Sequence, residues 1–429
     1  MKNSKKVLIL TYYWPPSGGS GVQRWMYFAK YLKSLGWEPF VITVDEKQAS
    51  YPVLDHQLLN EVKDIEVIKT DTKEPLKIYS QILTGSSYKG IPQGEVSKKG
   101  WIAKFAAFVR GNFFIPDARK GWNTYAKFEA EKCIRNNDID KVITTGPPHS
   151  THRVGWELKT KLGIKWWADF RDPWTDIFYN KYFYRTLWAQ KIDARAEQKV
   201  LKTADGILTT VGGNLIQKLQ NKAPDQNFHV LPNGYDAKLM ASVPKTTVKP
   251  FHLVYTGLLT DNQDYLSVIK VLNEMANHHD IQLSLAGNIS DSIIDKIKGN
   301  APKIKVVNMG YLTHKEAVVL IRSGDLLLNF VFRGADQDMI SGKLLEYLAS
   351  EVPVLSLGDP RSEAGKLLKK ASFAQMIDAN DTTAIKSFIK SAFRQKNKLT
   401  NQMPNIEKWS KKTISLELSH ILEGNATDL

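Results

Sequence analysis

Short apolar runs alternate with helical patterns along the first half of the chain. The run 7–11 precedes a polar, glycine-rich loop, and the segment from about 22 to 35 then carries apolar residues at helical spacing: Trp25, Phe28, Ala29 and Leu32. Gly36 ends that helix, and further apolar runs predict strands at 38–44, 65–69, 141–145, 165–169 and 206–210. Because strands and helices alternate, the pattern predicts a parallel, doubly wound α/β sheet.

The same alternation restarts in the second half. Apolar runs predict strands at 251–256, 281–286, 305–309, 326–330 and 354–356, with helices between them. The stretch 236–250 has few apolar residues and several Lys, Thr and Pro, which is typical of an interdomain linker. A chain of 429 residues is long enough for two domains. We therefore expect Rossmann-like domains at 1–235 and 251–400, and a closing segment, 401–429, whose helix near 406–422 packs back across them.

Composition indicates a folded protein of a reducing compartment. Hydrophobic residues make up 42% of the chain and charged residues 24%. The single cysteine, Cys133, has no partner for an internal disulfide, which suits the cytoplasm. The apolar run 7–10 is too short for the core of a signal peptide, and no apolar stretch is long enough to span a bilayer.

The net charge of +15 favours negatively charged binding partners. Such a surplus attracts nucleic acid, anionic lipid headgroups or phosphate-rich substrates. The chain has no zinc-ligand spacing, no aromatic RNA-binding signature and no helix-turn-helix pattern, so we expect no nucleic acid partner.

The segment 338–349, which reads DMISGKLLEYLA, combines an acid, a helix start and a second acid. Ser341 is a favoured N-cap residue, because its hydroxyl can accept from a free backbone N–H one turn into the helix. The N–H groups of 342–344 would then lie at the positive end of the helix dipole, where a phosphate binds. Lys343 and Glu346 share one helix face, so a cation for a diphosphate and a carboxylate for a sugar diol project together.

This spacing resembles the acid-x7-Glu motif of retaining glycosyltransferases of family four, which have the GT-B fold of two Rossmann-like domains. The resemblance implies that Glu346 holds the ribose hydroxyls of a donor nucleotide and that Asp338 contacts the donor sugar. Asp338 stands where the family usually has a glutamate, which is one methylene longer. The sequence 233–236, Asn-Gly-Tyr-Asp, resembles the family's element between the domains. The residues alone also allow a solvated acidic helix start beside a leucine-rich core helix, and an ordinary Asn-Gly turn.

A glycine-rich loop at 15–24 follows the first predicted strand and opens the first helix. Glycine there lets backbone N–H groups approach a phosphate without a Cβ in the way. The spacing differs from the dinucleotide fingerprint and the P-loop. It resembles the first loop of the same glycosyltransferase family, which implies that Gly18 and Gly19 lie between donor phosphate and acceptor.

Two polar segments follow later strands of the first domain. The segment 144–152 contains His149 and His152, and 169–172 reads Asp-Phe-Arg-Asp. The resemblance implies a histidine beside the reacting sugar, and His149 is the first candidate for it. Asp172 is the candidate for orienting the acceptor or accepting its proton. The alternatives are a hydrogen-bonded structural histidine and a local ion pair that shapes the loop.

The chain departs from the family where the donor diphosphate is usually held. An Arg and a Lys are usual after the first strand of the second domain, but 255–262 reads YTGLLTDN and contains neither. We expect Lys343 to replace them, with Arg333 as the next candidate, because a leaving diphosphate needs positive charge. Tyr311 follows a strand where the family seats the nucleobase. The full set of predicted donor-binding residues is Gly18, Gly19, Gly257, Tyr311, Arg333, Ser341, Gly342, Lys343, Leu344 and Glu346.

The stretch 98–120 mixes aromatic residues with cations and contains one acid, Asp117. Such a mixture suits contact with an anionic membrane surface. Its apolar positions, which include Trp101 and Phe105, also fit a helix packed on the core. The sequence leaves both interpretations open.

The resemblance implies an enzyme that transfers a sugar, with retention, from a nucleotide diphosphate-sugar to a hydroxyl of a glycan or polyprenyl-linked acceptor in surface polysaccharide synthesis. We expect a cytoplasmic protein in peripheral contact with the inner face of the plasma membrane. No Asp-x-Asp motif follows a predicted strand, and the resemblance implies transfer without a metal or other cofactor. The alternatives are a nucleotide-sugar 2-epimerase of the same fold and a non-enzymatic polyanion-binding protein on a degenerate transferase scaffold.

Overall fold

The chain forms two compact units. The computed structural model describes residues 5–51, 53–74, 101–246, 249–334, 339–396 and 403–425. Unit 1 comprises Met1–Pro232 and Ser415–Leu429, and unit 2 comprises Asn233–Ile414. The C-terminal residues thus belong to unit 1. There Ser419 accepts a hydrogen bond from the Trp37 indole at 2.8 Å, and Glu423 pairs with Lys5 at 2.5 Å.

The described part of unit 1 contains one sheet of seven parallel strands in the order β3-β2-β1-β4-β5-β6-β7. The strands are β1 (Lys5–Leu10), β2 (Trp37–Val44), β3 (Glu66–Thr70), β4 (Lys141–Gly146), β5 (Lys165–Phe170), β6 (Gly206–Thr209) and β7 (Phe228–Val230). The strands β1, β4 and β5 are almost wholly buried, as expected for a sheet covered on both faces.

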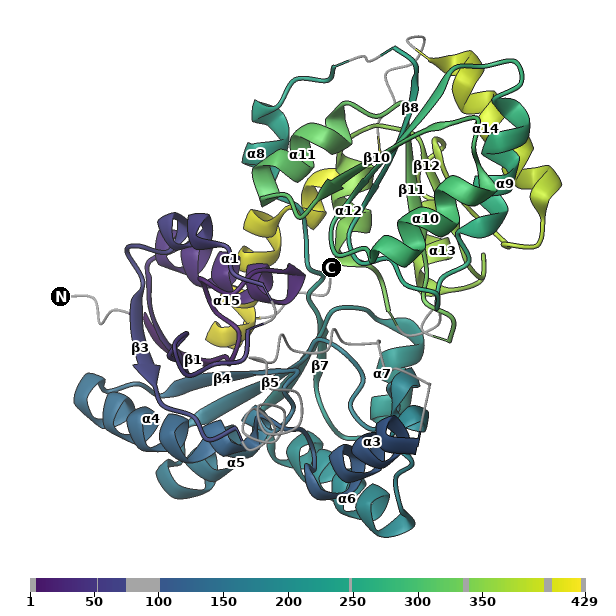
Figure 1. Ribbon diagram of the computed structural model, residues 1–429. Coiled ribbons are helices and arrows are strands. Elements are labelled where there is room, and N and C mark those ends of the chain that lie inside the picture. The colour runs from purple at the N-terminus through teal and green to yellow at the C-terminus, as the bar shows by residue number, and fades with distance from the viewer. Residues whose placement is uncertain are drawn as a thin grey trace. The chain divides into compact units, whose positions relative to one another are not determined.

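Helices cover both faces of this sheet (Figure 1). The helices α1 (Ser20–Ser34) and α15 (Lys411–Glu423) lie over one face, and α4 (Asn123–Asn137), α5 (Thr151–Leu162) and α6 (Leu187–Thr203) lie over the other. The predicted apolar stripe of α1 is buried, which explains why that segment is helical and which side faces the sheet. The remaining elements of unit 1 are η1 (His56–Glu61), α3 (Trp101–Phe113), η2 (Lys120–Trp122), η3 (Phe178–Phe183) and α7 (Gly213–Gln220).

Unit 2 repeats the arrangement with six parallel strands among its described residues, in the order β10-β9-β8-β11-β12-β13. The strands are β8 (Phe251–Thr256), β9 (Ile281–Ala286), β10 (Lys305–Gly310), β11 (Leu326–Phe330), β12 (Val354–Leu357) and β13 (Ala374–Ile377). Its helices are α8 (Ala237–Ser242), α9 (Leu266–Met275), α10 (Asp291–Asn300), α11 (His314–Arg322), α12 (Gly342–Ala349), α13 (Glu363–Leu368), α14 (Thr382–Gln395) and the 3-10 turn η4 (Ile406–Trp409).

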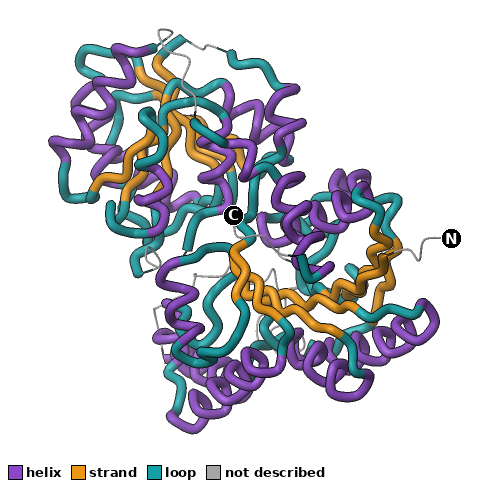
Figure 2. The backbone as a smooth tube through the Cα atoms, turned by 180° about the vertical axis from the view of Figure 1, so that it is seen from behind, coloured by secondary structure: helices purple, strands orange, loops and turns teal. Residues whose placement is uncertain are grey.

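Alternate side chains of β8 belong to two separate cores, one on each face of the sheet. Leu253 packs with α9, α10 and α14, whereas Val254 packs with α11, α12 and α13. Figure 2 shows the strands of unit 2 running between these two helical layers. The doubly wound parallel sheets expected for both domains are therefore confirmed.

The structure differs from the sequence prediction in three short elements. The strands β7 and β13 were not expected, because they are only 3 and 4 residues long and lie at sheet edges. The segment 236–250 is not a plain linker, because it contains α8. Met240 and Val243 from this segment are buried against Tyr235 and Val318, so they join the core of unit 2. A helix of 6 residues is too short to be revealed by periodicity.

The strand order locates the functional edge of each unit. In such sheets a ligand binds beyond the carboxyl ends of the strands, where the strand order reverses. That point lies between β1 and β4 in unit 1, and between β8 and β11 in unit 2. The loops at these points are 11–19 and 147–150 in unit 1, and 257–265 together with the described residues 331–334 and 339–341 in unit 2.

Candidate functional site

In unit 2, two glycines bring the strand ends together beside Lys343. Gly257 follows β8 with a φ of +119°, and its N–H donates to the carbonyl of Ala286 at 2.7 Å. A Cβ on Gly257 would lie 3.4 Å from the Lys343 ammonium. A Cβ on Gly287 would lie only 2.2 Å from the Gly257 carbonyl oxygen, so the close approach of these turns requires glycine.

Helix α12 is held against the end of β8 by two side chains from one of its faces. The Thr256 N–H donates to the Tyr347 hydroxyl at 2.9 Å, and the Lys343 ammonium donates to the Thr256 carbonyl at 2.8 Å. Leu344 and Leu348 are fully buried beneath them. Burial of each such leucine stabilises the fold by roughly 1.5–3 kcal/mol, which holds the helix in place.

The Lys343 ammonium lies over an aromatic ring rather than beside a described acidic side chain. It is 3.7 Å from the ring centroid of Tyr255. Within the described ranges no carboxylate lies close enough to Lys343 to form an ion pair. Burial lowers the pKa of Lys343 to about 7. A phosphate bound at this point would restore a counter-charge and favour the protonated form.

Glu346 is held ionised by two basic side chains. One carboxylate oxygen, Oε1, accepts a hydrogen bond from His314 Nε2 at 2.7 Å and lies 3.9 Å from the Lys411 ammonium. Burial alone would raise the pKa of Glu346, but the attraction of His314 and Lys411 outweighs it and leaves this pKa below its ordinary value. No described residue donates a hydrogen bond to the second oxygen, Oε2.

His314 and Lys411 were missed at the sequence level. Thr313 and Glu316 form a capping box that begins α11, and this places His314 in the first turn of the helix. The sequence contains that capping signal, but it does not reveal the contact between His314 and Glu346, which are 32 positions apart.

The start of α12 corrects one prediction. Ser341 occupies the N-cap, but its hydroxyl makes no capping hydrogen bond. The Leu344 N–H donates to the Ser341 carbonyl at 2.9 Å, so it is not one of the free donors expected for a phosphate. The backbone closes the first turn by itself, which leaves Gly342 and Lys343 as the predicted backbone donors. Asp338 lies outside the described residues.

The other two donor-side candidates lie on the surface of unit 2. Arg333, whose side chain is 56% exposed, contacts Asp264 at 2.5 Å and donates to the Asp261 carbonyl at 3.2 Å. Its charge is therefore already paired, whereas that of Lys343 has no acidic partner among the described residues. Tyr311 follows Gly310 at the end of β10 and is 47% exposed.

In unit 1, the glycine-rich loop is fixed at the start of α1. The Gly18 N–H donates to the Val53 carbonyl at 2.9 Å, and Gly19 is the N-cap of α1 with a φ of +97°. The guanidinium of Arg171 lies against this first turn, because a Cβ on Gly21 would be 2.3 Å from its Nη1. The structure thus brings a cation to the loop, which sequence analysis had treated only as part of a local ion pair.

His149 and His152 lie together at the end of β4. The His149 ring is parallel to Trp174 and the His152 ring to Phe170, with interplanar angles of 6° in both pairs. Burial lowers the pKa of His149 well below its usual range and that of His152 to about 3, so both rings are neutral. His149 Nδ1 and His152 Nε2 have no hydrogen-bond partner among the described residues, and both face Gly146.

The structure separates the two acids of 169–172. Asp169 is fully buried and accepts hydrogen bonds from Arg24 at 2.8 Å, Trp25 at 2.7 Å and Thr145 at 2.9 Å, so it holds α1 to the sheet. Asp172 is partly exposed and lies 3.5 Å from Arg171. Only Asp172 retains a carboxylate that can reach a substrate.

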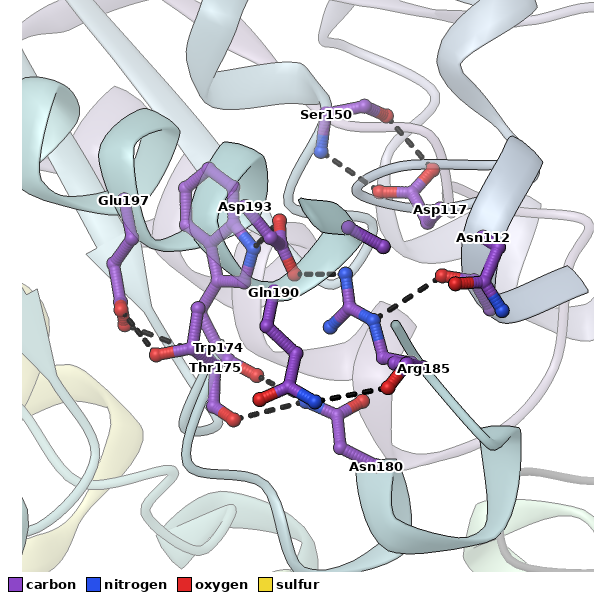
Figure 3. A network of polar contacts seen from close by, with 12 residues as sticks. Asn112, Asp117, Ser150, Trp174, Thr175, Asn180, Arg185, Gln190, Asp193 and Glu197 are labelled. Atoms are coloured by element: carbon purple, nitrogen blue, oxygen red, sulfur yellow. Dashed lines mark hydrogen bonds and ion pairs between the residues drawn. The ribbon is translucent and has the colours of Figure 1, made fainter. Parts of the chain in front are cut away.

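A buried polar network positions the segment between β5 and α6 (Figure 3). The Trp174 indole donates to Asp193 at 2.8 Å, and Asp193 also pairs with Arg185 at 2.7 Å. Glu197 accepts from the Thr175 hydroxyl at 2.5 Å. Because these acids come from α6, they fix the segment that carries Trp174, the ring beside His149.

The comparisons with known proteins identify the fold. No protein-family model matches the chain, and no curated protein matches it. A glycosyltransferase from Rickettsia africae superposes with a TM-score of 0.60 at 14% identity, over 99% of both chains. The HepE protein of Anabaena, in complex with UDP-glucose, superposes with a TM-score of 0.60 at 11% identity, over 98% of this chain and 99% of that chain. The chain adopts the GT-B fold.

A third GT-B match is relevant to the alternative activity. A proposed UDP-N-acetylglucosamine 2-epimerase from Listeria monocytogenes superposes with a TM-score of 0.58 at 13% identity, over 99% of both chains. The GT-B fold class expected from the sequence is thus confirmed. Among the described residues, no three or more acidic, histidine or cysteine side chains are grouped so that they could hold a metal ion. Across the same residues, no helix is long and apolar enough to cross a membrane.

Proposed function

We propose that this protein is a retaining glycosyltransferase of the family-four type. It moves a sugar from a nucleoside diphosphate-sugar to a hydroxyl of a glycan or polyprenyl-linked acceptor. The reaction belongs to surface polysaccharide synthesis and takes place in the cytoplasm, at the inner face of the plasma membrane. The observation that carries the proposal is the pair on α12. Lys343 is a cation without an acidic partner among the described residues, and Glu346 is a carboxylate held ionised one turn away.

The donor roles follow from the chemistry of each group. Glu346 Oε2 accepts from the ribose hydroxyls while His314 holds Oε1. The ammonium of Lys343 binds the diphosphate near Gly257, where the absent Cβ leaves room, and the amide of Gly342 adds a donor. Backbone groups of Tyr311 contact the base. Asp338 contacts the sugar.

The reaction requires stabilisation of the negative charge that develops on the leaving diphosphate. A preorganised cation at the leaving oxygen stabilises the transition state, where that charge is largest. In the ligand-free protein the pKa of Lys343 is about 7. Binding of the diphosphate raises this pKa, so the ligand itself favours the charged form of the lysine. In the retaining reaction the leaving phosphate helps to take the proton of the acceptor hydroxyl on the same face.

Unit 1 supplies the groups proposed for the acceptor side. The neutral His149 accepts a hydrogen bond from a sugar hydroxyl, and Asp172 orients the acceptor. Gly19 presents its backbone N–H group at the start of α1, whereas the Gly18 N–H already donates to the Val53 carbonyl, so Gly18 contributes only the room that its absent Cβ leaves. Arg171 adds a cation beside that loop.

The direct test has two steps. Thermal unfolding with a panel of nucleotide sugars first identifies the donor. The protein is then incubated with this donor and an acceptor lipid, and NMR assigns the anomeric configuration of the product. A stabilising donor and a product of retained configuration would support the proposal. A chain that no nucleotide sugar stabilises, or a product of inverted configuration, would overturn it. The epimerase alternative, which the Listeria match favours, predicts an altered or released sugar without any acceptor.

Changing His314 to alanine is expected to weaken nucleoside diphosphate binding about fivefold, because Glu346 loses the group that orients it, at a net cost of about 1 kcal/mol. Isothermal titration measures the effect. Glutamine at 314 can still donate to Glu346 and should recover most of the loss. The matched control is His278→Ala, because His278 is exposed beyond α9. Equal affinity of the His314→Ala variant and the unmodified chain would exclude this role.

Transfer is expected to persist after metal removal, since Lys343 supplies the positive charge. Treatment with EDTA followed by gel filtration should change the initial rate by less than about twofold. A complete loss that Mg²⁺ or Mn²⁺ restores would show that a metal bears part of the diphosphate charge.

A further inference from the structure

Two neighbouring segments of unit 1 expose large apolar side chains. On α3, the exposed fractions are 77% for Trp101, 55% for Phe105 and 67% for Phe113. At the start of α6, they are 74% for Leu187 and 67% for Trp188, and Tyr184 just before them is 52% exposed. Contiguous apolar exposure of this kind marks an interaction surface. Packing of the Trp101 and Phe105 face on the core, which the sequence allowed, is not observed.

The two segments are joined by direct hydrogen bonds. The Asn112 side chain donates to the Tyr184 carbonyl at 3.2 Å and accepts from the Thr186 N–H at 2.7 Å. Arg185 Nε donates to the Gly111 carbonyl at 3.2 Å. Figure 1 shows α3 beside α6, and Figure 3 shows Asn112 close to Arg185. The two segments therefore lie side by side, and their exposed side chains are together called the aromatic surface: Trp101, Phe105, Phe113, Tyr184, Leu187 and Trp188.

Charge at this surface is almost wholly of one sign. Helix α3 contains no acidic residue, and Lys104 is exposed on the same helix face as Trp101 and Phe105. On α6, Lys191 and Arg195 are exposed on the face that continues from Trp188.

The acids of α6 do not offset these cations. Asp193 pairs with Arg185, and Glu197 pairs with Lys222. The side chains of Asp193 and Glu197 are only 2% and 0% exposed. They face the protein interior, so the outer face of the helix start presents cations alone.

We propose that the aromatic surface docks the protein on an anionic lipid bilayer. Aromatic rings and leucine insert at the level of the headgroups, and the flanking cations pair with lipid phosphates while their stems lie along the apolar layer. A protein partner with an apolar centre would not require cations on both helices and buried acids on one. The proposal deepens the contact assigned to 98–120, of which 98–100 lie outside the described residues, and adds α6, which the sequence did not indicate.

Vesicle sedimentation tests the proposal with the full chain. The unmodified protein is expected to sediment with vesicles of phosphatidylglycerol and phosphatidylcholine, but not with phosphatidylcholine alone. The double variant Leu187→Ser/Trp188→Ser should bind at least tenfold more weakly. Lys191→Glu/Arg195→Glu should also bind at least tenfold more weakly, because each cation near the surface contributes about fivefold.

Controls separate this result from misfolding and from the proposed chemistry. Phe128→Ser removes another exposed aromatic, 68% exposed on α4, and should leave vesicle binding unchanged. Stabilisation by the nucleotide sugar should be the same in all variants, so the membrane proposal and the transferase proposal fail separately. Vesicle binding that survives both double variants would overturn the proposal. So would a dimer in light scattering that dissociates in the Leu187→Ser/Trp188→Ser variant, because the surface would then join two copies.

Discussion

Replacing Glu346 with alanine is expected to weaken binding of the donor nucleoside diphosphate roughly 100-fold. Two hydrogen bonds from ribose hydroxyls to a carboxylate, each about 1.5 kcal/mol, would be lost, and together they account for this factor. Isothermal titration with the nucleotide that best stabilises the unmodified chain measures the loss. Glu346→Gln keeps one acceptor and should lose only about tenfold.

The control for Glu346 is another paired glutamate in unit 2. Glu274 on α9 forms an ion pair with Lys386 at 2.8 Å on the surface, and Glu274→Ala should leave the affinity unchanged. Thermal unfolding without ligand shows whether the Glu346 variants remain folded. A folded Glu346→Ala protein that binds the nucleotide as tightly as the unmodified chain would refute the ribose role. The 2′-deoxy nucleotide should bind Glu346→Ala and the unmodified chain with more similar affinities.

Lys343→Met is expected to lower kcat/KM roughly 100-fold while the folded state becomes no less stable. Loss of the cation removes about 2–4 kcal/mol of stabilisation from the leaving diphosphate. Folding lowers the pKa of Lys343 from 10.5 to about 7, so its charge costs folding free energy at every pH below 10.5. That cost is largest below pH 7, and methionine removes it. We therefore expect an equal or higher unfolding temperature at pH 6–7.

The pH dependence of donor binding distinguishes Lys343 from a merely structural residue. Below pH 7 the lysine is already charged in the free protein, so affinity is at its maximum. Above pH 7 binding must take up a proton, so affinity falls as pH rises, by up to tenfold per unit. A nucleotide sugar is the suitable ligand, because its esterified diphosphate does not titrate there. The Lys343→Met variant should bind the nucleotide sugar weakly at all pH values. If its affinity fell with pH as steeply as that of the unmodified chain, a group other than Lys343 would be responsible for the pH dependence.

The helix that carries Lys343 and Glu346 was predictable because its signals are local. Three positions place the two side chains on one face whatever surrounds them, and the apolar residues between them specify the buried side. The same reasoning failed at Ser341, whose hydroxyl makes no capping bond because the backbone closes the turn alone. Propensity ranks residues for a position but does not decide which of several donors and acceptors pair.

Most of the electrostatics at the site came from residues distant in the chain. His314 and Lys411 meet Glu346 from two other helices, and the Tyr255 ring lies beneath the Lys343 ammonium. The aromatic surface likewise depends on Asn112, which ties α3 to a segment more than seventy positions later. Whether a side chain is exposed depends on the residues that cover it. Helical periodicity alone therefore did not decide whether Trp101 is exposed or buried.

The sequence by itself determined the two doubly wound sheets, the ends of most strands and the shared face of Lys343 and Glu346. These depend on alternation, turn residues and helical spacing, which act over a few positions. The tertiary structure alone decided that Asp169 is a buried anchor while Asp172 is partly exposed, that Glu346 is held ionised, and that Arg171 lies against the first turn of α1. Burial and charge pairing depend on which residues are neighbours in space, and the fold brings those neighbours together from distant parts of the chain.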